Sequence, residues 1–550
     1  MKNLAVFDIE CYDKNKPFAV GLYDGKTYQM FEGKDCIQEF LEVALKPNKT
    51  YYAHNGGRYD FHFLTPYLIE DGYELKIFEK NSRYFRIIID KPRVNFKDSV
   101  MLLPFSLKRL TEVFGVEHQK ILLADNPEAK ELIYQDLRKL PDWQEYLEHD
   151  CKGLYEVLEK FNAFIGQYNA KLKTTLASQA MSIYKNNFAP KKFDIFSQKE
   201  DMIRDGYVGG RTEVFKKYGE SLFYYDFNSL YPYIMRKYKV PIGTYRVVDC
   251  PNSYNTGFID ATIRVDDLEI PFLHYKSSKL LYPTGEFRGV YTYPEIDFAE
   301  SLGYDINYNY IIEFEESDYI FKDYVDHFYN KKQNATNDID YQLSKLLLNS
   351  LYGKFGQNRN NETIISNPEE ILGLTPYDEE LNLFKKRSFN KYGTILPHIA
   401  AYVTAYARIE LYKKFMEVGF DNVFYCDTDS IISSKELSTG NNLGELKLED
   451  EIQEGIFLAP KTYGYINNKD EVVLKCKGFD VEKLSFNVYR EALAGKYDNF
   501  KVSRWRIKGI KGATTRKGQI SDVEKLERTL KHDQDKRVFD GINSKPIQLA

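Results

Sequence analysis

The stretch FYCDTDSII, residues 424–432, carries two carboxylates inside a run of apolar and aromatic residues. Such a run is typical of a buried β-strand or hairpin. Asp427 and Asp429 would therefore stand close together in a low-dielectric setting. Two ionised carboxylates repel each other there and are costly unless a positive partner neutralises them. The sequence predicts a cation at this place.

The N-terminus repeats the pattern. In NLAVFDIECY, residues 3–12, the near-continuous apolar residues predict a central strand. Asp8 and Glu10 fall on one face of it, because side chains alternate along a strand. An edge strand that exposes its acids to water would explain either pair alone. Two such pairs, with further acids at suitable places, favour metal binding at both.

Two more acids follow the N-terminal pair. Asp60 begins an apolar segment after a Gly-rich turn. Residues 143–158 have helical periodicity, which places Tyr146 and Asp150 four apart on one face. Four carboxylates at the end of a sheet suit a pair of divalent ions, roughly 3.5 to 4 Å apart, that hydrolyse a phosphodiester. Tyr146 would orient the attacking water.

The C-terminal two thirds supplies a third acid for the pair Asp427 and Asp429. FYYDFNSLYP, residues 223–232, predicts a strand that reaches Asp226 and then a helix start. We therefore expect Asp226 to join the other two carboxylates.

A helix is predicted over YQLSKLLLNSLYGKFG, residues 341–356, closed by Gly353. Lys345, Asn349 and Tyr352 share one face of it at i, i+4 and i+7. The lysine offers a charge to a triphosphate, and the tyrosine offers a flat face to a base or sugar.

Composition excludes several classes of protein. A chain of 550 residues is long enough for roughly two to four domains. No apolar run reaches the ~18 residues that span a bilayer, and a strand begins almost at the first residue. We expect no membrane segment and no signal or transit peptide.

The six cysteines form no Cys-x-x-Cys pair, so neither a disulfide framework nor a zinc site is predicted, and a reducing cytoplasm fits.

The net charge of -5 hides a basic C-terminal region. Residues 481–550 hold 16 Lys/Arg against 9 Asp/Glu, a net of +7. Residues 501–517 contain seven basic residues and no acidic one: Lys501, Arg504, Arg506, Lys508, Lys511, Arg516 and Lys517. This basic run suits a phosphate backbone. The alternative is an ordinary solvated surface.

The N-terminal acids resemble the three motifs of DnaQ-like 3′-5′ proofreading exonucleases. The first is Asp-x-Glu, the second Asn-x3-Tyr-Asp and the third Tyr-x3-Asp. The resemblance implies metal binding by four acids and contact with DNA by two other residues. The metal ligands would be Asp8, Glu10, Asp60 and Asp150, with Tyr146 in a catalytic role and Asn55 and Tyr59 contacting DNA.

Three later segments resemble motifs A, B and C of family B DNA polymerases. In order they read Asp-Phe-Asn-Ser-Leu-Tyr-Pro, Lys-x3-Asn-Ser-x-Tyr-Gly and Tyr-x-Asp-Thr-Asp-Ser. The resemblance implies that Asp226, Asp427 and Asp429 are catalytic, and that each active site takes two Mg²⁺ or Mn²⁺ ions. Asp226, Asp427 and the backbone carbonyl of Phe227 would be metal ligands. Contacts to the incoming dNTP would come from Phe227, Tyr231, Lys345, Asn349 and Tyr352, with Tyr231 as the steric gate beneath the deoxyribose.

Nearly the whole chain is similar to the protein-primed polymerases of linear phages and linear plasmids. YVGG, TAYAR and KTY match their Tyr-x-Gly-Gly, Thr-x2-Gly/Ala-Arg and Lys-x-Tyr motifs. The implied DNA contacts are Tyr207, Gly209, Gly210, Thr404, Arg408, Lys461 and Tyr463. A further lysine that helps to hold the triphosphate in these enzymes has two possible equivalents here, Lys331 and Lys332.

The implied architecture is a multidomain α/β and α+β protein. An RNase H-like exonuclease domain, residues 1–185, would precede a right-hand polymerase domain, residues 186–550. The parts of the polymerase domain would be the palm (about 190–240 and 394–480), a terminal-protein insertion (240–316), the fingers (326–356), a second insertion (357–393) and the thumb (481–550). The place of the second insertion fits a loop with which the phage enzymes encircle DNA and displace a strand.

The predicted function is DNA-directed DNA synthesis with 3′-5′ proofreading, started on a linear genome from a protein primer. Expected partners are primer-template DNA, dNTPs and a terminal protein, and we expect a monomer in the host cytoplasm. The nearest alternative is a family B polymerase started from a nucleic-acid primer. A non-catalytic DNA-binding replication factor is disfavoured by the intact acids. A stand-alone nuclease leaves Lys345, Tyr352 and Asp427 unexplained.

Overall fold

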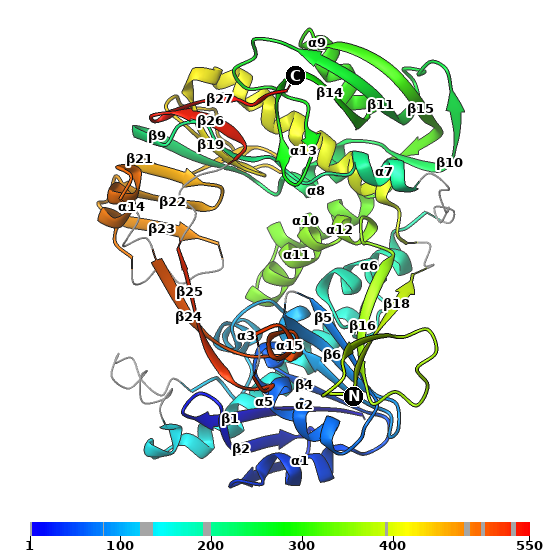
Figure 1. Ribbon diagram of the computed structural model, residues 1–550, viewed down its shortest axis with the longest axis vertical. Helices are drawn as coiled ribbons and strands as arrows, with labels where there is room; N and C mark the ends of the chain where they lie inside the picture. Colours follow the sequence, from blue (N-terminus) through cyan, green and yellow to red (C-terminus); the bar gives the residue numbers. More distant parts are fainter. Residues whose placement is uncertain are drawn as a thin grey trace.

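The computed structural model describes residues 3–80, 82–121, 136–190, 200–390, 394–477, 484–496, 501–516, 518–529 and 535–549. Two large β-sheets carry the two sets of predicted acids, one near each end of the long axis in Figure 1. Within these ranges, no helix has both the length and the apolar character needed to cross a membrane.

The N-terminal part is built on a ten-stranded mixed sheet. Its apolar strand β1 (Leu4–Tyr12) lies parallel to β4 (Lys49–Ala53) and antiparallel to β2 (Lys16–Tyr23), so it is interior, as predicted. The remaining strands are β3 (Tyr28–Glu32), β5 (Leu75–Lys80), β6 (Arg83–Ile89), β7 (Val94–Asp98), β16 (Asn360–Ser366), β17 (Thr375–Asp378) and β18 (Leu383–Phe389). The helices are α1 (Cys36–Ala44), α2 (Asp60–Glu70), α3 (Leu107–Phe114), α5 (Trp143–Gly166), α6 (Leu176–Asn187) and α7 (Glu200–Gly206).

The second large sheet has seven strands in the order β23-β22-β21-β9-β20-β19-β8. Its bounds are β8 (Thr212–Val214), β9 (Tyr218–Phe227), β19 (Val423–Asp427), β20 (Ser430–Ser433), β21 (Leu446–Ala459), β22 (Thr462–Asn467) and β23 (Val472–Cys476). Helices α8 (Leu230–Lys237) and α13 (Pro397–Val418) pack against one another beside it. The long apolar helix α13 is buried along most of its length, which fixes this sheet to its neighbours.

A smaller sheet is inserted between β9 and α10 in the chain. It is formed by β10 (Val240–Val248), β15 (Asp305–Asp318), β11 (Thr256–Val265), β14 (Thr284–Thr292) and the C-terminal β28 (Gln548–Leu549), with the short pair β12 (Tyr275–Lys276) and β13 (Leu280–Leu281) beside helix α9 (Tyr293–Ser301). Helices α10 (Lys322–Gln333), α11 (Asp338–Ser350) and α12 (Tyr352–Phe355) follow. The helix predicted over 341–356 is thus two helices that meet at Leu351, and Gly353 lies inside the second of them.

Two of the segments named in the predicted architecture pair with strands elsewhere in the chain. The second insertion, 357–393, does not stand alone, because its strand β16 pairs with β5 and extends the N-terminal sheet. The range 481–550 divides in two. Its elements are α14 (Phe486–Leu493), β24 (Lys501–Ile507), α15 (Ile510–Arg516), β25 (Val523–Thr529), β26 (Arg537–Asp540) and β27 (Asn543–Pro546). In Figure 1, β24 and β25 reach the N-terminal domain, whereas the last strands return to the inserted sheet, where β28 pairs with β14.

Candidate active sites

The acids of the seven-stranded sheet meet across three neighbouring strands. β20 lies between β9 and β19, and its first residue, Ser430, pairs with Asp226 on one side and with Asp427 on the other. Residues that pair across neighbouring strands point to the same face of the sheet. Asp226 and Asp427 therefore flank Ser430 on one face, although 201 residues separate them in the chain.

The turn between β19 and β20 brings the third acid to the same place. Thr428 occupies the left-handed region at φ 65°, and its N–H donates to the carbonyl of Arg211 at 2.7 Å. The carbonyl of Asp429 accepts from the N–H of Phe227 at 2.8 Å. These bonds hold the Asp429 turn against the end of β9, where Asp226 lies.

Two of these carboxylates, Asp226 and Asp429, are destabilised as anions. Burial raises the pKa of Asp226 to about 7, and the charge of Asp429 contributes to this rise. Burial also raises the pKa of Asp429, with a smaller contribution from Asp427. Among the described residues, Oδ1 of Asp226 is a buried oxygen without a hydrogen-bond partner. The site therefore suits a hard cation with oxygen ligands.

A lysine already lies on one of these acids. Nζ of Lys461 is 2.9 Å and 2.8 Å from the two carboxylate oxygens of Asp427. Lys461 sits at φ 62° in the turn before β22, and its N–H donates to the hydroxyl of Tyr425 at 3.0 Å. Tyr463, the other residue of this predicted motif, is buried against Tyr425.

Two of the residues predicted to bind the dNTP, Tyr231 and Tyr352, lie near Asp429. Tyr231 on α8 and Tyr352 on α12 pack together with ring centroids 4.3 Å apart and an angle of 30° between the ring planes. Lys345 and Asn349 are exposed on α11, one turn apart, as the predicted helix face requires. The side chain of Phe227 is buried, so only its backbone is open to a ligand role.

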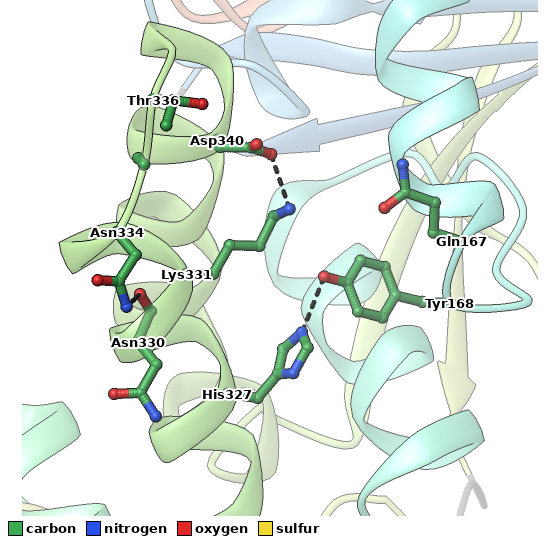
Figure 2. A pocket seen from close by; sticks show the side chains of 9 residues that line it. Gln167, Tyr168, His327, Asn330, Lys331, Asn334, Thr336 and Asp340 are labelled. Atoms are coloured by element: carbon green, nitrogen blue, oxygen red, sulfur yellow. Dashed lines mark hydrogen bonds and ion pairs between the residues drawn. The ribbon is translucent and has the colours of Figure 1, made fainter.

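Lys331 and Lys332 are adjacent near the end of α10 but have different surroundings. Nζ of Lys331 pairs with Asp340 at 2.8 Å, and with Tyr168 these side chains line a cavity of about 590 Å³ (Figure 2). Burial lowers the pKa of Lys332, and the charge of Lys345 lowers it further. Lys332 therefore lies on the side of Lys345, and Lys331 on the side of the cavity.

The N-terminal acids also converge. Ligand oxygens of Asp8, Glu10 and Asp150 all lie within 4.8 Å of one another. Asp60 is the first residue of α2, and its Oδ1 accepts from the N–H of Ile9, between the two acids of β1, at 3.0 Å. The four carboxylates thus come from β1, α2 and α5. Sequence reasoning predicted this set, and the fold brings all four together.

Burial dominates the electrostatics of the N-terminal site. It raises the pKa of Asp8 to about 7, with the charge of Asp150 adding to the effect. The pKa values of Glu10 and Asp60 rise well above their ordinary range for the same reason, with Asp8 contributing to both. Oδ1 of Asp150 is a second buried oxygen that lacks a hydrogen-bond partner in the described ranges. This donor set too fits divalent cations.

One residue of the N-terminal site was missed in the sequence. Nζ of Lys120 forms an ion pair with Asp150 and a hydrogen bond of 2.8 Å with the hydroxyl of Tyr146. Although burial lowers the pKa of Lys120, the Asp150 carboxylate raises it overall. The lysine lies 26 and 30 residues from these partners in the chain, so no local spacing marks it.

The predicted DNA contacts of the N-terminal domain are accessible. Asn55 is exposed at φ 65°, where its side chain meets that of Arg83. Tyr59 is half-buried and directly precedes Asp60. Both therefore lie at the edge of the carboxylate cluster.

Thr404 and Arg408, two of the predicted DNA contacts, lie inside the protein. Both are buried on α13, and the hydroxyl of Thr404 donates to the carbonyl of Ala401 at 3.0 Å. Arg408 donates to the carbonyls of Val208 and Gly209, each at 2.9 Å. Arg408 thus supports the segment 207–210 from inside the protein. In that segment Gly209 is exposed, and Tyr207 and Gly210 are half-buried.

The basic run 501–517 is partly paired within the protein. Arg506 and Lys508 approach carboxylates of residues 522–524 at 2.6 Å and 3.9 Å. Lys511 is exposed on α15. Lys517 lies outside the described residues. The run therefore offers less free positive charge than its composition indicates.

Comparison with known proteins agrees with this geometry. A family profile described as "DNA polymerase type B, organellar and viral" matches residues 43–124 and 125–435. The chain is 27% identical over 570 residues to a "Probable DNA polymerase" of Ascobolus immersus, covering 87% of this chain and 47% of the relative. It is 29% identical over 476 residues to the "DNA-directed DNA polymerase" of Enterobacteria phage PRD1, covering 78% and 76%. The chain spans about half the length of three of the fungal relatives that it matches, 44 to 59%.

A solved structure shares the fold. The chain superposes on "Phi29 DNA polymerase complexed with primer-template DNA and incoming nucleotide substrates" with a TM-score of 0.76 at 20% identity. The match covers 96% of this chain and 100% of that one. The predicted fold class, an exonuclease domain followed by a right-hand polymerase domain, is confirmed.

Proposed function

Because this chain belongs to the organellar and viral type B DNA polymerases, we propose that it is a DNA-directed DNA polymerase with 3′-5′ exonuclease activity. Its substrates are primer-template DNA and dNTPs. The observation that carries the proposal is the row Asp226, Ser430 and Asp427, with the Asp429 turn beside it. Two acids on one face with a third in the adjoining turn, and an unpartnered buried oxygen on Asp226, support a metal-dependent phosphoryl-transfer site.

In the polymerase site, Asp226, Asp427 and the carbonyl of Phe227 would hold two Mg²⁺ or Mn²⁺ ions, which would supply stabilisation of the charge that develops on the α-phosphate. The protein's own part is to fix these oxygens on adjacent strands. Lys461 lies within 2.9 Å of Asp427 and places a positive charge where a primer terminus would be held.

In the dNTP site, the rings of Tyr231 and Tyr352, with centroids 4.3 Å apart, form an aromatic wall near Asp429. Tyr231 is the steric gate that excludes a 2′-hydroxyl. Lys345 and Lys332 bind the triphosphate. Burial and the charge of Lys345 lower the pKa of Lys332, and an anionic ligand would offset both effects, whereas Lys331 is already paired with Asp340. This supports Lys332 over Lys331.

In the exonuclease site, Asp8, Glu10, Asp60 and Asp150 would hold divalent ions, which would supply activation of the attacking water. Tyr146 and Lys120 are joined by a hydrogen bond of 2.8 Å next to Asp150. Tyr146 orients the water, and Lys120 places a positive charge beside the developing phosphate charge.

Replication starts from a protein primer in this proposal. The inserted sheet of β10, β11, β14 and β15 stands where the terminal-protein region of protein-primed polymerases is expected. Initiation from a nucleic-acid primer is the second candidate, and it requires no role for this sheet in priming. Mixing the protein with a nucleotide-accepting terminal protein and a linear template, without any oligonucleotide primer, separates the two.

Primer extension tests the proposed function. The purified full chain with Mg²⁺, a primer-template and dNTPs should extend the primer, and Asp427→Ala should abolish extension. The same variant should still degrade single strands from the 3′ end, because Asp427 is remote from the N-terminal acids in the fold. Comparable extension by Asp427→Ala and the unaltered protein would contradict the assignment of the polymerase site.

A further inference from the structure

Glu295 is a buried carboxylate that belongs to none of the sequence motifs described above. It binds the guanidinium of Arg408, a predicted DNA-contact residue. Its Oε1 accepts from Nη2 and Nε of Arg408 at 2.6 Å and 3.2 Å. Its Oε2 accepts from the N–H and hydroxyl of Thr292, at 3.1 Å and 2.8 Å, at the start of α9. Glu295 is 0% and Arg408 3% exposed. The carboxylate is therefore fixed on both oxygens and shielded from water.

The free end of the same guanidinium holds a backbone segment. Nη1 of Arg408 donates to the carbonyls of both Val208 and Gly209 at 2.9 Å. A planar guanidinium that is held along one edge by a carboxylate presents its remaining donors in a fixed direction. The position of residues 208–209 thus depends on the orientation that Glu295 gives to Arg408.

The far side of this segment touches the polymerase acids. A Cβ placed on Gly210 would come within 2.7 Å of the side chain of Thr428. The carbonyl of Arg211 accepts from the N–H of Thr428 at 2.7 Å. Thr428 is the left-handed residue between Asp427 and Asp429. A continuous chain of contacts therefore runs from Glu295 through Arg408 and residues 208–211 to the carboxylate turn.

Stability alone is a weak reason for this arrangement. A buried ion pair can often be replaced by apolar residues of similar volume without loss of stability. What apolar residues cannot supply is a pair of hydrogen bonds to two successive carbonyls. The polar pair therefore fixes the position of the segment. Apolar side chains in its place would fill the same space without fixing that position.

We propose that Glu295 is a positioning residue for the polymerase site, acting through Arg408 on the segment 208–211 and on the turn that carries Asp427 and Asp429. The inference rests on the proposed function. Glu295 lies on α9, which packs on the inserted sheet. The insertion, residues 240–316, therefore contributes to DNA synthesis even when the primer is DNA.

Glu295→Gln in the full-length protein tests the inference, with Glu313→Gln as its matched control. Glu313 is 1% exposed in the same insertion, and its hydrogen bonds go to Arg246, Asn252, Asn255 and Tyr293, all within the insertion. Glu295→Gln should lower kcat for extension of a DNA primer by roughly 10- to 100-fold, the cost of a small misplacement of catalytic groups, with little change in KM for dNTP. Exonuclease activity should stay unchanged in both variants, and Glu313→Gln should extend primers at the rate of the unaltered protein.

Extension by Glu295→Gln equal to that of the unaltered protein would overturn the inference alone. Losses of both activities in step with the melting temperature, in both variants, would also overturn it. Absence of extension by the unaltered protein would overturn the proposed function as well. If Glu295→Gln does not fold, the double variant Glu295→Met with Arg408→Met replaces the pair by apolar side chains: a folded protein that degrades but does not extend supports the inference, and one that extends normally refutes it.

Discussion

The two carboxylate sites of this protein are assembled in different ways. In the proposed polymerase site, Asp226 and Asp427 lie on strands that both pair with Ser430, so strand pairing sets their separation. In the proposed exonuclease site, the acids come from β1, α2 and α5, and Asp60 and Asp150 are 1% and 5% exposed. Each site also has a lysine on one acid, Lys461 on Asp427 and Lys120 on Asp150.

The difference concerns how strongly each site needs a cation. The pKa values of Glu10 and Asp60 rise well above their ordinary range, whereas in the other site the rise reaches about 7 at Asp226. Deeper burial raises the cost of unneutralised charge. The exonuclease site therefore depends more on its ions and its lysine than the polymerase site does.

The double variant Asp8→Ala with Glu10→Ala is the strongest test that the sites are independent. It removes half of the N-terminal carboxylates and leaves the seven-stranded sheet intact. Degradation of single strands should fall to background, a loss of several orders of magnitude when the ions cannot bind. Extension of matched primers should remain near normal, and mispaired ends should persist. Metal-dependent degradation by a clean preparation of this variant would show that the acids are misassigned.

The lysines offer a sharper comparison. Lys120→Met and Lys461→Met keep side-chain length and remove the charge. Each should lower only the activity of its own site, on the order of 10²-fold, because a fixed charge near the reacting phosphate is lost. The effect of Lys120→Met should be the larger one. Lys152→Met, on the same helix α5 as Asp150 but paired with Glu148 at 2.6 Å, is the control. Equal losses of both activities in either variant would point to a general loss of structure.

Tyr231→Val tests a feature that only the polymerase site has. With the ring removed from its stack on Tyr352, a ribonucleotide should be used at least about tenfold better, since the clash with the 2′-hydroxyl is gone. Tyr233→Val, two residues further along α8, should leave discrimination unchanged. The ratio of kcat/KM for dNTP and rNTP measures the effect. An unchanged ratio in Tyr231→Val would assign the gate to another side chain.

One buried histidine in each region makes the stability of the fold depend on pH. Burial lowers the pKa of His62, in α2, and of His398, in α13, to about 3. An unfolded histidine has a pKa near 6.5, so the stability each group contributes is complete above pH 6.5 and is lost as the pH falls. The loss is about 2 kcal/mol per histidine at pH 5.

His62→Leu and His398→Leu should each flatten the fall of melting temperature between pH 7 and pH 5. His62 lies where Gly509, just before α15, meets the N-terminal domain, so its variant should protect that contact in particular. Thermal melts of both variants and the unaltered protein at the two pH values decide this. Parallel pH profiles for all three proteins would mean that these rings are not the titrating groups.

Local patterns in the sequence predicted a large part of the two sites. Period-two alternation placed Asp8 and Glu10 on one face of β1, and helical spacing placed Tyr146 and Asp150 together on α5. The break at Leu351 was missed, because a helix of this length reads the same with or without a kink. The burial of Arg408 was also not foreseen, because a motif shows which residues recur together but not which way they face.

The sequence by itself determined the order of the acids, the strands and helices that carry them, and the family, since these depend on residue types and short spacings. Only the tertiary structure decided which charges neutralise them. Lys120 reaches Asp150 across 30 residues, Lys461 reaches Asp427 across 34, and Arg408 reaches Glu295 across 113. Such contacts depend on how separate elements pack. Burial strengthens the attraction between the charges, because opposite charges attract strongly only where water has been excluded.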